Sequence, residues 1–319
     1  YKNMKPLLHG NLNKEELDKY HDEYFMPQTV EKSIEVIDIM CELMLKFIDN
    51  QKKVQSITED DRYARILMQM VFLKTINSKK LLQGVNFDQS KSVKLQEVLD
   101  PLSISLFVRS IYETITSFSL IYNKCNSEER EIVFRLWKLA GLNYRKRFEE
   151  NISLEEHKIK INNEKQEIKT LINEIKASSL FLHLNEHNQQ KIITCIKDKK
   201  YLIVFDNNEV VFHSWGTIST VVGMNPDNLK NMYTYFSLNT HPSFISAAQF
   251  KEMFDDDEFY KSNSVLYANF IQLFLSMFIA DYLTYFPDQF EEFKRLKIHD
   301  QYLINSYNVM LRNQSYSII

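Results

Sequence analysis

The sequence predicts a mainly α protein: a multi-helix bundle with a protruding helical arm and one small β-hairpin. Two observations support this. Only 5 Gly and 6 Pro occur in 319 residues, so turns and strand ends are scarce. Hydrophobic residues make up 44% of the chain, recur mostly at helical spacing, and suffice for a core. We expect one domain over residues 1–319.

The N-terminal helices are expected between residues 14 and 98. Pro27 separates a short first helix from a long second one, for which Thr29 is a suitable N-cap. The third helix begins near Thr58 with an acidic first turn, which favours the positive end of the helix dipole. The predicted helices cover 14–24, 30–50 and 58–77. The stretch 81–98 fits neither a helix nor a strand clearly.

The core of the fold is expected at 101–150, and its central helix covers 102–122. One face of this helix is apolar, and the other carries small hydroxyl side chains with Arg109 and Glu113 as its only charges. A face meant for water usually carries Lys and Glu instead. We therefore expect a second helix or a ligand close to this face. Arg109 and Glu113 are four residues apart and can form an ion pair.

A second core helix is expected from Ser127 to about residue 150, and a helical arm covers 153–198. The arm is strongly polar, with Ile161, Ile168 and Ile175 seven residues apart. This spacing predicts a solvent-exposed helix that forms a short coiled-coil pair. The arm, and surplus apolar residues on several helices, favour a homodimer.

Residues 201–215 change to a strand pattern and predict the β-hairpin, with its turn at 206–209. The C-terminal helices are expected over 226–319, including one from Asn225 to His241 and a core helix at 264–286. The apolar run 265–280 is too short to span a bilayer and carries a polar stripe, so no membrane partner is expected. That stripe consists of Asn269, Gln272 and Ser276.

Composition and motifs exclude several common functions. The net charge of −3 argues against a general surface for nucleic acid or anionic membranes. Cys41, Cys125 and Cys195 are scattered, which is typical of reduced, buried thiols in a cytoplasmic protein. No GxGxxG, P-loop or GxSxG motif occurs, and no cofactor is expected. His183–His187 spells HxxEH, but the asparagines around it indicate a helix boundary, so no metal site is expected.

A second polar stretch, Tyr233–Ser243, follows the hairpin. Ser237 and His241 lie four residues apart at the expected end of a helix, where carbonyl groups stabilise a protonated imidazole. Together with Arg109 and Glu113 they form the candidate site. Arg109 would bind a phosphate or carboxylate, Glu113 would orient it, and His241 would transfer a proton. Alternatively, His241 caps the helix or bonds a buried hydroxyl group.

Three segments carry a resemblance to a known family: Arg109-Ser-Ile-Tyr112-Glu113, Trp215-Gly-Thr-Ile-Ser219 and Tyr235–Ser243. Residues 95–250 resemble uncharacterised bacterial helical proteins, a domain of unknown function with R-x-x-(Y/F)-E and S-x-x-x-H-x-S motifs. The resemblance implies no activity. It marks as functional Arg109, Glu113, Ser237, His241 and Ser243. Candidate ligand-binding residues are Tyr112, Ser237, Ser243 and Trp215.

A looser similarity is to nucleotide-binding helical domains of higher eukaryotes and prokaryotes, many of them ribonucleases of toxin–antitoxin and antiphage systems. Two hypotheses follow. The chain is a structural or interaction protein with a buried Arg-Glu-His network, assembling through the arm. Alternatively, it is a protein that binds a polar ligand or nucleotide, such as a nuclease-like enzyme of defence or stress that uses Arg109 and His241. The sequence does not decide whether the chain is an enzyme. It also leaves open whether a small polar ligand or a nucleic acid is a partner.

Overall fold

The computed structural model of the protein describes residues 14–52, 57–87, 95–226, 231–240, 243–255 and 257–318. The described part is mainly α-helical with two small antiparallel sheets, which confirms the predicted mainly α, multi-helix fold. It divides into two compact units. The large unit comprises the described residues up to Phe118 and from Gly223 onward, and the small unit is Ser119–Val222. The sequence predicts a single domain over residues 1–319. That prediction remains untested by the division into two compact units.

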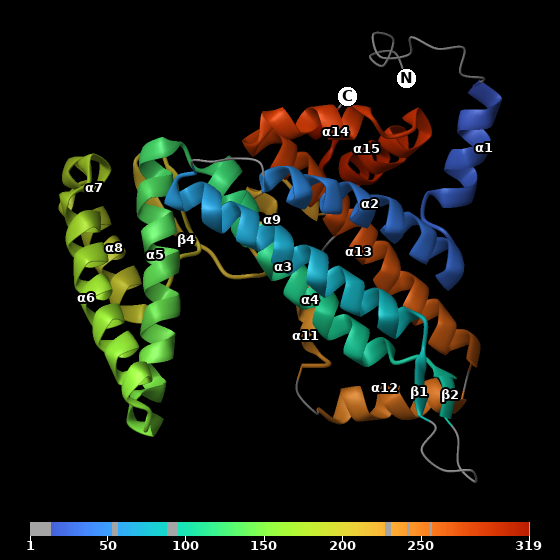
Figure 1. Ribbon diagram of the computed structural model, residues 1–319, viewed down its shortest axis with the longest axis horizontal. Coiled ribbons are helices and arrows are strands. Elements are labelled where there is room, and N and C mark those ends of the chain that lie inside the picture. The colour runs from blue at the N-terminus through green and yellow to red at the C-terminus, as the bar shows by residue number, and fades with distance from the viewer. Residues whose placement is uncertain are drawn as a thin grey trace. The chain divides into compact units, whose positions relative to one another are not determined.

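The first helices of the large unit lie where the sequence places them (Figure 1). The side chain of Thr29 accepts a hydrogen bond from the backbone of Lys32, and Thr58 caps the third helix in the same way. The elements of the large unit are α1 (Lys14–Tyr24), α2 (Val30–Gln51), α3 (Glu59–Leu82), β1 (Val85–Phe87), β2 (Leu95–Val98), α4 (Pro101–Phe118), α11 (Met232–Ser237), α12 (Phe244–Asp255), α13 (Asp257–Tyr285), η3 (Pro287–Gln289), α14 (Phe290–Lys294), α15 (Ile298–Arg312) and η4 (Gln314–Tyr316).

Helix α13 is the centre of the large unit. It packs against α2, α4 and α15, and Figure 1 shows it behind the layer that α2, α3 and α4 form. By length and composition Tyr260–Tyr285 could cross a membrane, but 89% of its most apolar window is buried inside the structure. A mostly apolar helix that is largely covered by other helices is a core helix. This confirms the interpretation of 264–286.

Two residues of the polar stripe on α13 donate hydrogen bonds to backbone carbonyl groups at the start of α2 and just before it. The Asn269 amide donates to the Pro27 carbonyl at 3.4 Å, and the Gln272 amide donates to the Ser33 carbonyl at 3.1 Å. The Gln272 carbonyl oxygen accepts from the Tyr307 hydroxyl at 2.6 Å. A buried polar group costs stability unless it is paired, so these bonds fix how α2 and α15 sit on α13.

A buried ion pair joins the last helix to the core helix. Arg312 on α15 donates to both carboxylate oxygens of Asp281 on α13, at 2.5 and 2.9 Å. The exposed fractions of the two side chains are 2% and 6%. Two parallel N–H···O bonds are the preferred geometry of guanidinium with carboxylate.

Three features of the large unit differ from the sequence predictions. Within the unassigned stretch 81–98, Val85–Phe87 and Leu95–Val98 form the antiparallel pair β1–β2, with Val85 opposite Val98. The continuous helix expected from Asn225 to His241 is wrong, because Asn231 has a left-handed φ of 63° and α11 after it has six residues. Helix α12 was not predicted, since its apolar residues show no single face.

The small unit begins where the central helix was expected to continue. Helix α4 ends at Phe118, and Ser119–Lys124 forms a π-helix, η1, in place of the α-helix predicted as far as Tyr122. The other elements are α5 (Ser127–Arg145), η2 (Lys146–Asn151), α6 (Glu155–Ala177), α7 (Ser179–His183), α8 (Glu186–Asp198), β3 (Ile203–Asp206), β4 (Glu209–Phe212) and α9 (Ile218–Val221).

Helix α6, the first part of the predicted arm, packs along α5 of the same chain. Its residues Ile161, Leu171 and Ile175 are buried. Ion pairs border the contact: Arg135 with Glu174, Lys138 with Glu167, and Arg145 with Glu164. The arm is therefore not solvent-exposed on its apolar face. That face pairs within the chain, and assembly of two copies through the arm stays a prediction.

The predicted hairpin is confirmed as β3–β4, with Ile203 opposite Phe212. Its turn residues Asn207 and Asn208 have φ values of 50° and 65°, the left-handed pair of a type I′ turn. The buried Asn188 on α8 donates to the Asn208 carbonyl at 3.2 Å and accepts from the Val210 amide at 2.9 Å. One amide side chain thus fixes the hairpin to α8.

Replacing Asp281 by Asn keeps the shape of the side chain but leaves the buried Arg312 charge without its counter-ion. We expect the free energy of unfolding to fall by about 3–5 kcal/mol. Denaturant titration followed by circular dichroism measures this. Glu291→Gln, which changes an exposed ion pair with Lys294, should alter stability by less than about 1 kcal/mol. Equal effects of the two variants would contradict the buried pair.

The three cysteines are free and buried, and burial raises the pKa of each thiol to about 12. Since the ordinary pKa is about 8.5, the folded state retains these protons as the pH rises. Their stabilising contribution is complete below about pH 9 and is lost as the pH approaches 12. A thiol reagent at pH 8 should therefore modify the protein only as fast as it unfolds. Rapid labelling of the folded protein would contradict this.

Candidate functional site

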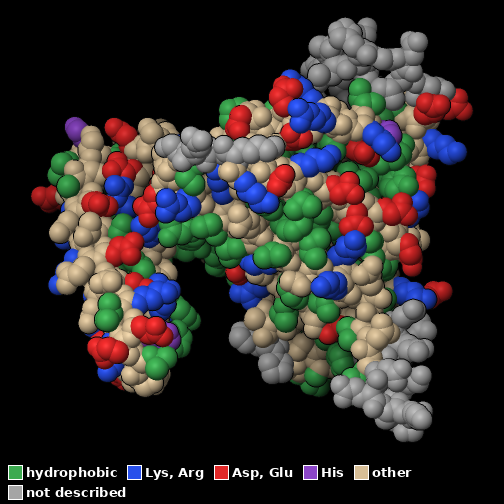
Figure 2. Space-filling model, viewed as in Figure 1, with side chains coloured by type: hydrophobic (Ala, Val, Ile, Leu, Met, Phe, Trp, Pro, Cys, Tyr) green, Lys and Arg blue, Asp and Glu red, His purple; other side chains and the backbone are tan. Residues whose placement is uncertain are grey.

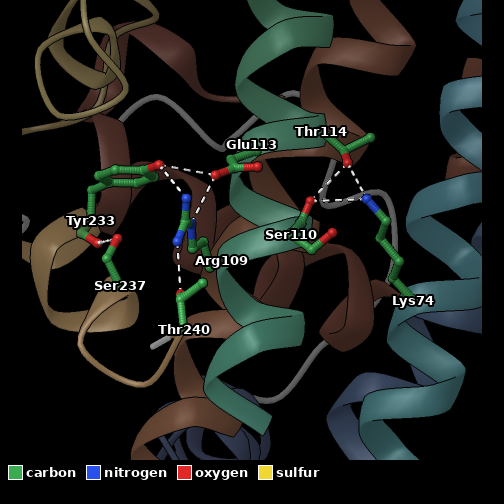
Figure 3. Close-up of polar contacts among 8 residues, drawn as sticks. All are labelled: Lys74, Arg109, Ser110, Glu113, Thr114, Tyr233, Ser237 and Thr240. Atoms are coloured by element: carbon green, nitrogen blue, oxygen red, sulfur yellow. Dashed lines mark hydrogen bonds and ion pairs between the residues drawn. The ribbon is translucent and has the colours of Figure 1, made fainter. Parts of the chain in front are cut away.

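The candidate site is built on one turn of α4, where Arg109 and Glu113 point the same way. The Arg109 Nε donates to Glu113 Oε1 at 2.9 Å, which confirms the ion pair predicted from their spacing. Both side chains are partly buried, with exposed fractions of 25% and 30%. Figure 3 shows them on the side of α4 that faces α11.

The other guanidinium nitrogens of Arg109 donate to the segment after Asn231. Nη2 donates to the Tyr233 hydroxyl at 2.8 Å, and Nη1 donates to the Thr240 hydroxyl at 2.7 Å. The Tyr233 hydroxyl in turn donates to Glu113 Oε1 at 3.0 Å. The guanidinium carbon also lies 5.0 Å from the centre of the Tyr233 ring. We call Arg109, Glu113, Tyr233 and Thr240 the Arg109 network.

The Arg109 network links its members through shared donors and acceptors. Glu113 Oε1 accepts from both Arg109 and Tyr233, and the Tyr233 hydroxyl accepts from Arg109 and donates to Glu113. Charge-assisted hydrogen bonds of this kind are the stronger ones in proteins. The network therefore joins α11 and the turn after it to α4.

The hydroxyl-rich face of α4 lies against other helices, as the sequence predicts. Ser105, Thr114 and Thr116 are buried. From α3, the Lys74 Nζ donates to Thr114 Oγ1 at 2.6 Å and to the Ser110 carbonyl at 3.1 Å (Figure 3). Short hydroxyl side chains let α3 approach closely and still offer oxygen atoms to the Lys74 ammonium group.

Burial and charge shift the pKa values of this region in a consistent way. Burial raises the pKa of the Tyr233 hydroxyl, and the Glu113 charge adds to this, so the phenol keeps its proton. Burial lowers the pKa of Lys74, while Glu113 opposes that shift. Burial also acts to lower the pKa of Arg109, but the hydrogen bond and charge of Glu113 outweigh it and raise that pKa overall.

Three other predicted site residues have local structural contacts. Ser237 ends α11 and donates its hydroxyl to the Tyr233 carbonyl at 2.6 Å. Ser243 precedes α12 and accepts from the Ser246 amide at 3.1 Å, as a helix cap does. Tyr112 is buried and packs its ring 5.7 Å from Tyr233 and 5.6 Å from Phe274.

The remaining predicted residues do not join the Arg109 network as described. His241 lies outside the described residues. Trp215 belongs to the small unit and packs its ring against Tyr201 at 6.2 Å. In the HxxEH motif, His183 ends α7 and Glu186 begins α8, so His183 and His187 do not share one helical face. Among the described residues no group of three or more His, Cys, Asp or Glu side chains converges as metal ligands do.

A cleft of about 750 Å³ lies elsewhere in the large unit, at the start of α2. Its walls include Thr29 and Glu31 of α2, Gln83 after α3, and Lys261 of α13. No residue of the Arg109 network lines it. The cleft and the candidate site are therefore separate places.

No family model, curated protein or solved structure matches the chain. The resemblance to uncharacterised bacterial helical proteins therefore stays a prediction, as does the looser similarity to nucleotide-binding domains. What the site does has to be argued from its own geometry.

Sequence reasoning found Arg109 and Glu113 but missed Tyr233, Thr240 and Lys74. Tyr233 and Thr240 lie in the polar stretch Tyr233–Ser243, but the prediction favoured Ser237 and His241 because they are four residues apart at an expected helix end. The side-chain chemistry was the available signal. A phenol can accept a hydrogen bond from a guanidinium and donate one to a carboxylate, and a hydroxyl can accept from the same guanidinium. Lys74 had no signal, since only the packing of α3 on α4 brings it near.

Tyr233→Phe should remove the hydroxyl that joins Arg109 to Glu113 while keeping the ring in place. We expect the free energy of unfolding to fall by about 1–3 kcal/mol, because a bond to a charged group is lost. Tyr144→Phe is the control, since it removes the same hydroxyl from a tyrosine that is 59% exposed. It should cost less than about 0.5 kcal/mol. Indistinguishable denaturation curves for the two variants would contradict the network.

Proposed function

We propose that this chain is a helical interaction protein, in which the Arg109 network is structural and function resides in the surfaces it supports. The observation that carries the proposal is the use of Arg109. Its Nε, Nη1 and Nη2 each donate to a side chain of the same protein. Three of the five N–H donors of the guanidinium thus bind side chains of the fold itself.

The chemistry around the network supports the same proposal. Proton transfer needs a group that titrates near neutral pH and reaches the substrate. Tyr233 has a raised pKa, and Glu113 Oε1 is occupied by two donors from its own chain. These features suit a permanent connection between helices better than a reacting centre.

The properties of the chain suggest its setting. Free, buried thiols fit a cytoplasmic protein, which is the location we propose. A net charge of −3 favours protein partners over nucleic acid. The predicted resemblance to uncharacterised bacterial helical proteins would make it a bacterial protein.

One observation favours a second candidate function, the binding of a small polar ligand. Arg109 and Glu113 keep a quarter or more of their side-chain surface exposed, and Thr240 is exposed. An anion could therefore reach the outer edge of the guanidinium, with His241 as proton donor. If this candidate is right, Arg109 contributes mainly to ligand binding and little to the stability of the fold.

Arg109→Ala separates the two candidates. If the network is structural, the free energy of unfolding should fall by about 2 kcal/mol, because several charge-assisted bonds are lost together. Arg109→Lys should restore little of this, since an ammonium group cannot reach three acceptors in one plane. Denaturant titration of the full chain measures both variants.

Arg295→Ala is the matched control, because Arg295 is 69% exposed and pairs with Glu292 within one helical turn. Its effect should stay below about 1 kcal/mol. If Arg109→Ala is no more destabilising than this control, the structural proposal is wrong and the ligand-binding candidate takes its place.

A further inference from the structure

Helix α3 carries a stripe of seven residues that faces away from the core. All seven are exposed, and they lie within about 80° of the helix circumference. The apolar members Ile66, Met70 and Leu73 have exposed fractions of 39%, 41% and 59%. We call these residues the α3 stripe: Glu59, Arg62, Ile66, Met70, Leu73, Asn77 and Lys80.

The stripe is distinct from the face that α3 uses inside the large unit. The buried face, which includes Leu67 and Val71, lies on the opposite side of the helix and packs towards α2 and α4. Leu45 of the neighbouring α2 is also 52% exposed. Figure 2 shows hydrophobic side chains gathered over the middle of α2 and α3. Single exposed apolar residues are ordinary, but a contiguous group marks an interaction surface.

The charges at the two ends of the stripe identify the partner. Glu59 lies at the N-terminal end and Lys80 at the C-terminal end. A second α3 running antiparallel would bring each of these charges beside its opposite. Reversal about the midpoint between Gln69 and Met70 matches two further pairs of the stripe and places Met70 opposite Gln69, an exposed residue beside the stripe. The pairs that this register makes are Glu59 with Lys80, Arg62 with Asn77, and Ile66 with Leu73.

This self-complementarity is what a two-fold interface requires, because the same surface must fit itself. Spacings of three and four residues along the stripe are also those of a two-helix seam. We propose that the chain forms a homodimer by antiparallel pairing of α3 with α3 of a second copy. This inference rests on the proposed function as an interaction protein and names its partner.

Sedimentation velocity of the full chain over about 1–100 µM covers the weak and moderate affinities at issue. We expect the dimer fraction to rise with concentration. Leu73→Lys should leave a monomer at every concentration, with an unchanged circular dichroism spectrum. Leu182→Lys, a change at a 63% exposed leucine of α7, should leave the dimer intact.

Charge reversal tests the register. Lys80→Glu and Glu59→Lys should each weaken the dimer at least tenfold, and the two changes in one chain should restore it. Restoration is specific to antiparallel pairing, and it keeps the test meaningful if Leu73→Lys fails to fold. Two single reversals without rescue by the double variant would overturn the register and the proposal with it.

Cross-linking tests the axis. Met70→Cys places a thiol beside the two-fold axis, so mild oxidation should give a covalent dimer. Met310→Cys on α15 is the matched control, since Met310 is 40% exposed, and the native cysteines are buried. Equal cross-linking of both variants, or a wild-type monomer at every concentration, would overturn the dimer. Neither result changes the expected behaviour of Arg109→Ala, so the two proposals fail separately.

Discussion

The large unit depends on covering α13 from every side. A helix that is mostly apolar is stable in water only when other helices cover it, and α2, α4 and α15 cover most of α13 here. The polar groups on α13 then have to find partners inside the protein. Gln272 and Asp281 find them in Tyr307 and Arg312 of α15, so the requirement for burial also orders the helices around the core.

The position of α4 explains why a charged cluster forms where it does. One side of α4 lies against α13 and another against α3, and close approach there favours short hydroxyl side chains. Arg109 and Glu113 lie at the edge of this contact, with 25% and 30% of their side-chain surfaces exposed, and Arg109 bonds to the segment that carries α11. Since α11 is only six residues long, it depends on tertiary contacts. These are the side-chain bonds to Arg109 and the burial of Phe236 against Phe270 and Phe274 of α13.

The fold was largely predictable, and the site only in part. Thr29, Thr58 and the asparagines of the hairpin turn act through neighbouring backbone, so sequence alone located their elements. The break at Asn231 was not predictable, because a left-handed residue inside a helical pattern depends on tertiary contacts. For the same reason the ion pair of Arg109 with Glu113 was foreseen from spacing, while Tyr233 and Thr240 were not.

The account depends on Arg109 and Tyr233 acting together to hold α11 against α4. A double-mutant cycle on the free energy of unfolding, with Arg109→Ala, Tyr233→Phe and the double variant, measures their coupling directly. We predict a coupling energy of about 1 kcal/mol or more, because each side chain loses its partner in the single variants. Additive effects, with a coupling near zero, would contradict the account.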